Sequence, residues 1–183
     1  HIDLTKKLFP ALNILIKTIE DKADSLKNIV KTGRTHLMDA MPLEFQQELS
    51  AWASQLKNSK KSFHFLEKRI LEMPLGGTAV GTGINAHPRF ANSFAKELSS
   101  LSGGKFKYIP SEDFFHELSA QDTAVQVSGE LKNLAIILLK ISNDLRWMNS
   151  GPLAGLSEIE LKALQPGSSI MPGKVNPVIP EAV

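Results

Sequence analysis

The sequence contains no cysteine among its 183 residues, which excludes disulfides, thiolate metal sites and a cysteine nucleophile. No apolar run approaches the roughly 20 residues that a membrane-spanning helix needs. An excess of one charge is also lacking, because 21 Lys and Arg stand against 19 Asp and Glu, for a net charge of +2. No basic block stands out, so we expect neither a membrane nor a nucleic acid as partner.

What remains is the composition of an ordinary globular protein, with 42% hydrophobic and 22% charged residues. A chain of this length buries about 70% of its unfolded surface, so we expect one domain over residues 1–183. The first residues, 1-HIDLTKKLFP-10, show neither an initiator methionine nor the apolar region of a signal peptide. The last residues, 178-VIPEAV-183, stop without a closing element, and we expect the chain to be cut from a longer one.

Three long segments carry apolar residues at steps of three and four, as one face of a helix does. The stripes run from Leu8 to Val30, from Phe45 to Ile70 and from Ala124 to Met148. A shorter helix is predicted over about 88–102, and no segment alternates convincingly as a strand. We therefore predict an all-α, elongated bundle of long helices. Its apolar stripes exceed what three helices shelter alone, which favours association with copies of itself or with missing parts of the chain.

The glycine-rich stretch 76-GGTAVGTG-83 resembles a phosphate-binding loop only in composition. It lacks the Lys-Ser or Lys-Thr pair and the dinucleotide-binding spacing, and no strand leads into it. We interpret it as a tight turn where two helices approach closely.

The segment 33-GRTHLMDA-40 places Thr35 and His36 together after a glycine that we expect to end the first helix. A lone histidine after a helix more often serves only to form hydrogen bonds with backbone groups. Thr35 and His36 together, however, offer a hydroxyl and a side chain that titrates near neutrality. His64, His87 and His116 have no comparable group of polar neighbours in the sequence, and we interpret them as structural or surface residues. No histidine pair has metal-ligand spacing, so we expect no metal and no cofactor.

The segment 167-GSSIMPGKVNP-177 has no helical or strand period and is rich in polar groups. Its glycines let backbone amides approach an anion, Lys174 supplies a positive charge and Asn176 supplies donors. An anion site is therefore favoured over a solvated flexible loop. Ser168 and Ser169 offer hydroxyls, and a serine acts as a base only if amides and a cation stabilise its alkoxide.

These motifs resemble the fumarase/aspartase superfamily. The segment 167–177 is similar to its signature loop, and Gly173 resembles class II fumarases where aspartases usually carry alanine. His36 points the same way, because aspartases carry glutamine there, and 75-LGGTAVGTGIN-85 and 142-SNDLRWMNSGP-152 are also similar to fumarase segments. The resemblance implies the central domain of an all-α fold that forms a homotetramer, with each active site drawing on three subunits. The family's N-terminal and C-terminal domains would then be absent.

The implied activity is the reversible hydration of fumarate to L-malate without a metal, through an aci-carboxylate intermediate. By resemblance Ser168 is the base, His36 the acid partner and Glu181 the carboxylate paired with that histidine. The residues implied in substrate binding are Thr35, His36, Ser169, Lys174, Val175 (through its backbone) and Asn176. The implied location is cytoplasmic, or mitochondrial in a eukaryote.

One residue departs from the family, because Leu153 in 150-SGPLAG-155 stands where arginine is usual. With the N-terminal carboxylate-binding segment missing, we expect the chain alone to be inactive. Two alternatives stay open: another lyase of the superfamily, most plausibly aspartase, and a non-catalytic oligomerisation bundle.

Overall fold

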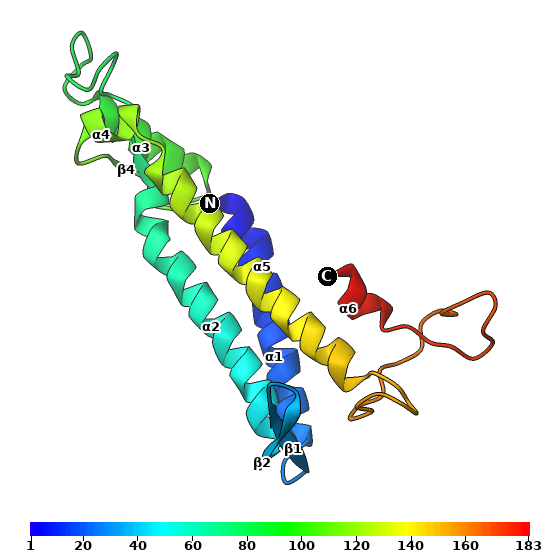
Figure 1. Cartoon of the computed structure of the whole chain (residues 1–183). Coiled ribbons are helices and arrows are strands. Elements are labelled where there is room, and N and C mark those ends of the chain that lie inside the picture. The colour runs from blue at the N-terminus through cyan, green and yellow to red at the C-terminus, as the bar shows by residue number, and fades with distance from the viewer. The chain divides into compact units, whose positions relative to one another are not determined.

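A computed structural model describes residues 1–183, which form two compact units, His1–Leu131 and Lys132–Val183. The elements of the first unit are η1 (Leu4–Leu8), α1 (Phe9–Ser25), β1 (Val30–Thr35), β2 (Met38–Glu44), α2 (Phe45–Ile70), β3 (Glu72–Met73), α3 (Phe90–Leu101), β4 (Ile109–Pro110) and α4 (Phe114–Ser119) (Figure 1). Helix α5 (Asp122–Met148) begins in the first unit and continues into the second, where a long irregular segment leads to α6 (Val178–Ala182). None of these helices combines the length and the apolar character that crossing a membrane requires.

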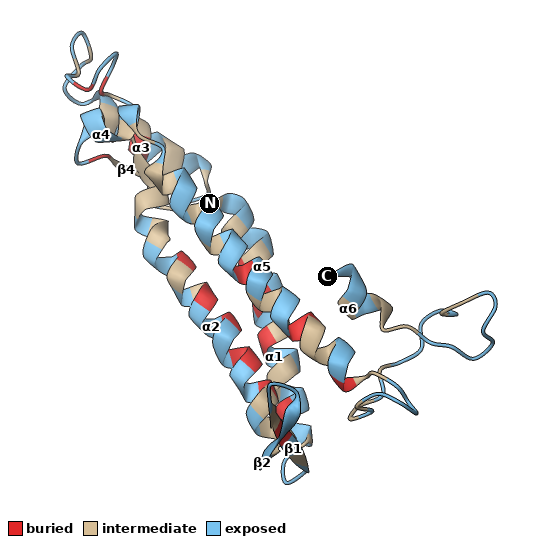
Figure 2. Ribbon diagram, in the orientation of Figure 1, coloured by how far each residue is buried: buried red, intermediate tan, exposed pale blue.

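Helices α1 and α2 pack against each other and form the core of the first unit (Figure 2). The second predicted stripe is confirmed, because its central residues from Leu49 to Phe63 are buried, and even the interrupting Ser59 is only 2% exposed. The first stripe is partly wrong. Phe9 and Ile16 are buried on either side of Leu12, whereas Leu8 and Leu15 are half-buried, so the packed face is rotated by about one residue.

A β-hairpin follows α1, which corrects the expectation of a purely helical fold. Strands β1 and β2 pair antiparallel, and the register shifts between Thr32 and Arg34. This bulge sets Gly33 so close to the Met41 carbonyl that a Cβ would clash there. The irregularity and Pro42 hide the two-residue period of a strand, which is why the sequence predicted none. Helix α1 therefore ends at Ser25, eight residues before the glycine at which its end was expected.

The other predicted helices are confirmed as α3 and α5. Along the third stripe Leu134, Ile141 and Met148 are buried, but Leu131 is 43% exposed. Apolar side chains also lie exposed elsewhere on this helix, at Val125, Ile136, Leu139 and Trp147. The long helices thus carry more apolar surface than this chain covers, as the sequence predicted.

Within the first unit, an ion pair joins the end of α2 to the first turn of α5. Arg69 Nη2 lies 2.6 Å from Asp122 Oδ2, and Arg69 Nη1 donates to Gln126 Oε1 at 2.8 Å. The hydrogen bond from Arg69 lowers the pKa of the Asp122 carboxyl below its ordinary value of 3.8, and a contact with His116 acts in the same direction. Ionised Asp122 also suits the positive end of the α5 dipole.

We expect Asp122→Asn to lower the melting temperature of the chain in a pH-dependent way. A depressed folded-state pKa gives stability that is present above the unfolded pKa and is lost as the pH falls through the folded pKa. The melting-temperature gap between the two proteins is therefore largest near neutral pH and closes in acid. Asp21→Asn, which breaks only an exposed pair with Lys17 inside α1, serves as the control. A gap that stays constant from neutral pH to acid would contradict the assignment.

Candidate active site

Thr35 and His36 lie at the tip of the hairpin, where Thr35 pairs with Met38 and closes β1 onto β2. The two turn residues, His36 and Leu37, have φ angles of 53° and 62°. Positive φ at both central residues is the mark of a type I′ hairpin turn, which usually takes Gly or Asn. A bulky residue in this region is strained, and such strain concentrates at functional sites. The turn leaves the His36 side chain exposed.

The predicted anion loop is a closed structure in the second unit. Residues Pro166 and Val175 form an antiparallel bridge, and Gly167 N donates to Lys174 O at 2.8 Å. Asn176 Nδ2 donates to Gly167 O at 3.3 Å, so part of the amide's donor capacity closes the loop. The loop brings Gly167, Lys174 and Asn176 together, although they are up to nine positions apart.

The two serines of this loop differ in their surroundings. Ser168 is half-buried, and its Oγ accepts from Ile170 N at 3.3 Å, whereas Ser169 is exposed. An amide that donates to a hydroxyl oxygen favours negative charge there, as a serine base requires. The exposed Lys174 supplies a cation on the same loop.

We expect Gly167→Ala to disrupt this loop. A Cβ at this position would lie 2.8 Å from Lys174 O and 2.9 Å from Asn176 Oδ1, so the loop would have to shift. Misplacement of binding groups by about 1 Å costs on the order of 100-fold in rate. We expect a loss of that size in kcat/KM for the expected hydration of fumarate, measured with an enzyme that contains this chain. Gly129→Ala, in the middle of α5 with open space around it, should leave activity unchanged. Unchanged kcat/KM in the Gly167 variant would show that the loop closure is dispensable.

Glu181 lies on α6, near the end of α5. Its Oε1 is 3.7 Å from Arg146 Nε, and both side chains are nearly half exposed. The two residues line a cavity of about 370 Å³ together with Asn143, Trp147, Asn149, Ser150, Gly151, Val175 and Pro177. The sequence did not single out Arg146, although it lies within a stretch, 142–152, that carries the family resemblance.

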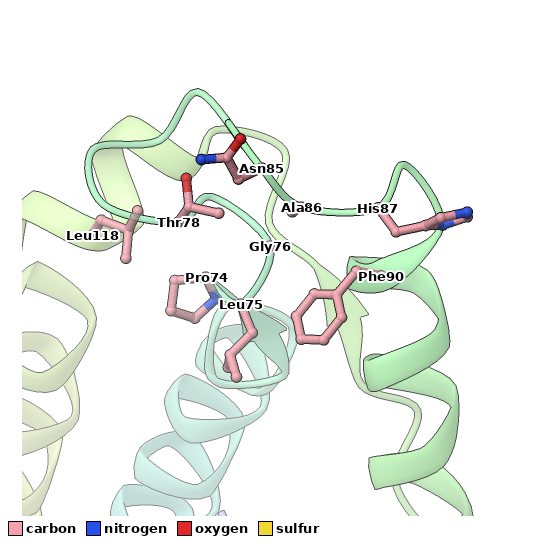
Figure 3. A pocket seen from close by; sticks show the side chains of 9 residues that line it. All are labelled: Pro74, Leu75, Gly76, Thr78, Asn85, Ala86, His87, Phe90 and Leu118. Atoms are coloured by element: carbon pink, nitrogen blue, oxygen red, sulfur yellow. The ribbon is translucent and has the colours of Figure 1, made fainter.

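The glycine-rich loop lines a separate cavity of about 480 Å³ in the first unit (Figure 3). Its interpretation as a tight turn where two helices approach closely is supported only in part: two of its glycines lie close to α4, but the stretch joins α2 to α3 as a longer loop. A Cβ on Gly77 would lie 2.7 Å from a methyl of Leu118, and one on Gly81 would lie 2.7 Å from the Phe115 ring. The lining is mostly apolar, with Pro74, Leu75, Ala86, Phe90 and Leu118 around Gly76, Thr78, Asn85 and His87.

His64, His87 and His116 are exposed and locally bonded, as predicted. His64 contacts Glu67 at 3.0 Å, His116 contacts Asp122 at 3.2 Å, and His87 Nδ1 accepts from Arg89 N at 3.1 Å. No group of three or more His, Asp or Glu side chains converges as a metal site would. Leu153 is 98% exposed, and no packing contact explains its presence.

The predicted site residues thus fall into two groups. Thr35 and His36 belong to the first unit, and those from Ser168 to Glu181 belong to the second. Each group is a partial constellation: an imidazole on a strained turn, and a loop with hydroxyls, a cation and amides.

Comparisons with known proteins decide the family. The family described as Lyase matches residues 2–183. The chain belongs to this lyase family. Class II fumarate hydratase 2 of Pseudomonas aeruginosa is 58% identical over 181 residues, which is 99% of this chain and 39% of the relative. The class II fumarate hydratase of Thermus thermophilus is 49% identical over 180 residues, or 98% of this chain and 38% of the relative.

Solved structures agree with the lyase assignment. A class II fumarase from Schistosoma mansoni superposes with a TM-score of 0.94 at 37% identity, over 99% of this chain and 40% of that one. A fumarate lyase:delta crystallin from Brucella melitensis, bound to cobalt, gives a TM-score of 0.88 at 43% identity, over 94% of this chain and 37% of that one. The resemblance to class II fumarases is thereby confirmed, and this lyase chain spans about two fifths of the length of these relatives.

Proposed function

We propose that the chain serves as the central segment of a class II fumarate hydratase, which interconverts fumarate and L-malate. The observation that carries this proposal is the closed loop 166–175, which holds Ser168 and Lys174 beside backbone amides. The names of relatives up to 58% identical over nearly the whole chain support the same activity.

When L-malate is dehydrated, the Ser168 alkoxide takes a proton from the malate carbon that lies beside one carboxylate. The electron pair moves into that carboxylate and gives a doubly charged aci-carboxylate. Lys174, Asn176 and the Val175 backbone hold this group and stabilise the charge that builds on it. Because these groups supply the stabilisation, we propose that no metal and no cofactor takes part.

Collapse of the aci-carboxylate then expels hydroxide from the neighbouring carbon. We propose that His36 donates a proton to this group, so that it leaves as water. Thr35, beside His36, and Ser169, on the anion loop, are proposed to bind the substrate. We propose that Glu181 pairs with His36. A nearby carboxylate favours the imidazolium form, which is the form that can donate the proton. The products are fumarate and water, the proton on Ser168 returns to solvent, and His36 regains a proton from solvent.

We further propose that the two groups of site residues meet between copies of the chain in a homotetramer. The exposed apolar side chains on α5 and the exposed hairpin tip support association. The chain by itself, lacking the segments that flank it in its relatives, is predicted to be inactive. We propose a cytoplasmic location.

A hybrid enzyme tests this function, in which the chain replaces the matching 181-residue segment of the Pseudomonas aeruginosa relative. We expect the hybrid to consume fumarate, followed by its ultraviolet absorbance, and to release no ammonia from aspartate. His36 and Gly173 favour this result over aspartase. A hybrid that assembles like its parent but lacks hydratase activity would contradict the proposal, and ammonia release would establish the aspartase alternative.

A further inference from the structure

The contact between Arg146 and Glu181 joins the last turn of α5 to α6 within the second unit. Arg146 is held from a second side, because its Nη1 donates to Asn143 Oδ1 at 3.1 Å. The guanidinium is planar with its donors in a fixed fork, so the hydrogen bond to Asn143 restrains the plane in which it lies. Its Nε edge therefore faces the Glu181 carboxylate.

This pair is poorly suited to a purely stabilising role. The 3.7 Å separation is longer than a hydrogen bond, and both side chains are nearly half exposed, where ion pairs contribute little to stability. A loose contact of this kind biases the orientation of a carboxylate without saturating its oxygens. Glu181 thus keeps acceptor capacity for another donor.

The location supports a role at the site. Arg146 and Glu181 are the charged groups among the residues lining the 370 Å³ cavity, and Val175 of the anion loop lines it too. A change in the Glu181 rotamer would therefore alter the charge distribution beside the loop that we propose binds the substrate carboxylate.

We propose that Arg146 is a positioning residue that orients the Glu181 carboxylate for its pairing with His36 of another copy. The proposal rests on the function proposed above. Arg146 touches no reacting atom and acts through Glu181, so its removal should affect turnover more than substrate binding.

A double-mutant cycle in the hybrid enzyme tests this role. We expect Arg146→Met to lower kcat about tenfold, a size typical of coupled neighbours, with KM nearly unchanged. In the Glu181→Gln background the same change should have almost no further effect. Lys140→Met removes another cation of α5, which pairs with Asp144 outside the cavity, and should leave kcat unchanged. Independent, multiplying effects of Arg146→Met and Glu181→Gln would overturn the proposal.

The pH profile separates positioning from simple electrostatics. Loss of an oriented Glu181 weakens the support of the imidazolium. Arg146→Met should therefore move the alkaline limb of the pH profile for malate dehydration to lower pH, and Glu181→Gln should move it in the same direction. Mere removal of a positive charge would move that limb to higher pH, and this result, or an unmoved limb, would also overturn the proposal. Arg146→Lys should restore part of kcat. An inactive unmutated hybrid would instead count against the proposed function.

Discussion

Replacement of Ser168 by alanine in the hybrid enzyme is expected to lower kcat by about 10²–10⁴-fold, the usual contribution of a general base. Alanine keeps the backbone of the loop and removes only the hydroxyl. Because the Oγ accepts a single loop amide at 3.3 Å, its loss should leave the loop closed and KM little changed. Steady-state kinetics in both directions measures the effect.

The adjacent Ser169→Ala variant is the informative comparison. Ser169 is exposed and is assigned to binding, so its removal should raise KM more than it lowers kcat. Exposed Ser100 on α3 provides a second control, and alanine there should change neither constant. Activity that survives in the Ser168 variant would contradict the assignment of Ser168 as the base.

Replacement of Phe63 by alanine is expected to cost about 3–5 kcal/mol in the free energy of unfolding of the chain, as for other fully buried aromatics. Phe63 is 0% exposed on α2, and its ring meets that of Phe9 on α1 edge-on, with centroids 6.1 Å apart. The change removes the ring and leaves a cavity between the two helices that form the core. Urea unfolding followed by circular dichroism measures the difference.

Phe65 offers a matched control on the same helix. It lies two residues further along α2 and is 83% exposed, so Phe65→Ala should change the unfolding free energy of the chain by no more than about 0.5 kcal/mol. Similar losses for both variants would show that α2 does not pack through the face that carries Phe63.

The sequence predicted the second and third long helices well because each has one apolar face with a nearly continuous period. Helix α2 follows its stripe from Phe45 to Ile70 almost residue for residue. The hairpin of Val30–Glu44 was not predicted from the sequence. Its strands are short, bulged at Gly33 and mostly exposed, so their residues show no alternation of buried and exposed positions. The one-residue rotation of α1 also depends on tertiary packing, which a stripe alone does not specify.

The candidate site was predictable where a motif is contiguous. Residues 167–177 are close in the sequence, and their glycines and prolines indicate a loop whatever lies around it. Arg146 was not predicted because its proposed role depends on its contact with Glu181, which lies 35 positions further along the chain. Such a contact is visible only in the folded chain. The strained turn at His36 was likewise hidden, because neither His36 nor Leu37 is a typical turn residue.

The most direct measurement is co-assembly of two inactive variants of the hybrid enzyme, His36→Asn and Ser168→Ala. If one copy lends the imidazole and another the loop, mixed oligomers contain some sites with both groups intact, and hydratase activity should reappear. Differently tagged copies purified in tandem prove that the oligomers are mixed. Mixed oligomers that remain as inactive as either parent would contradict a site shared between copies.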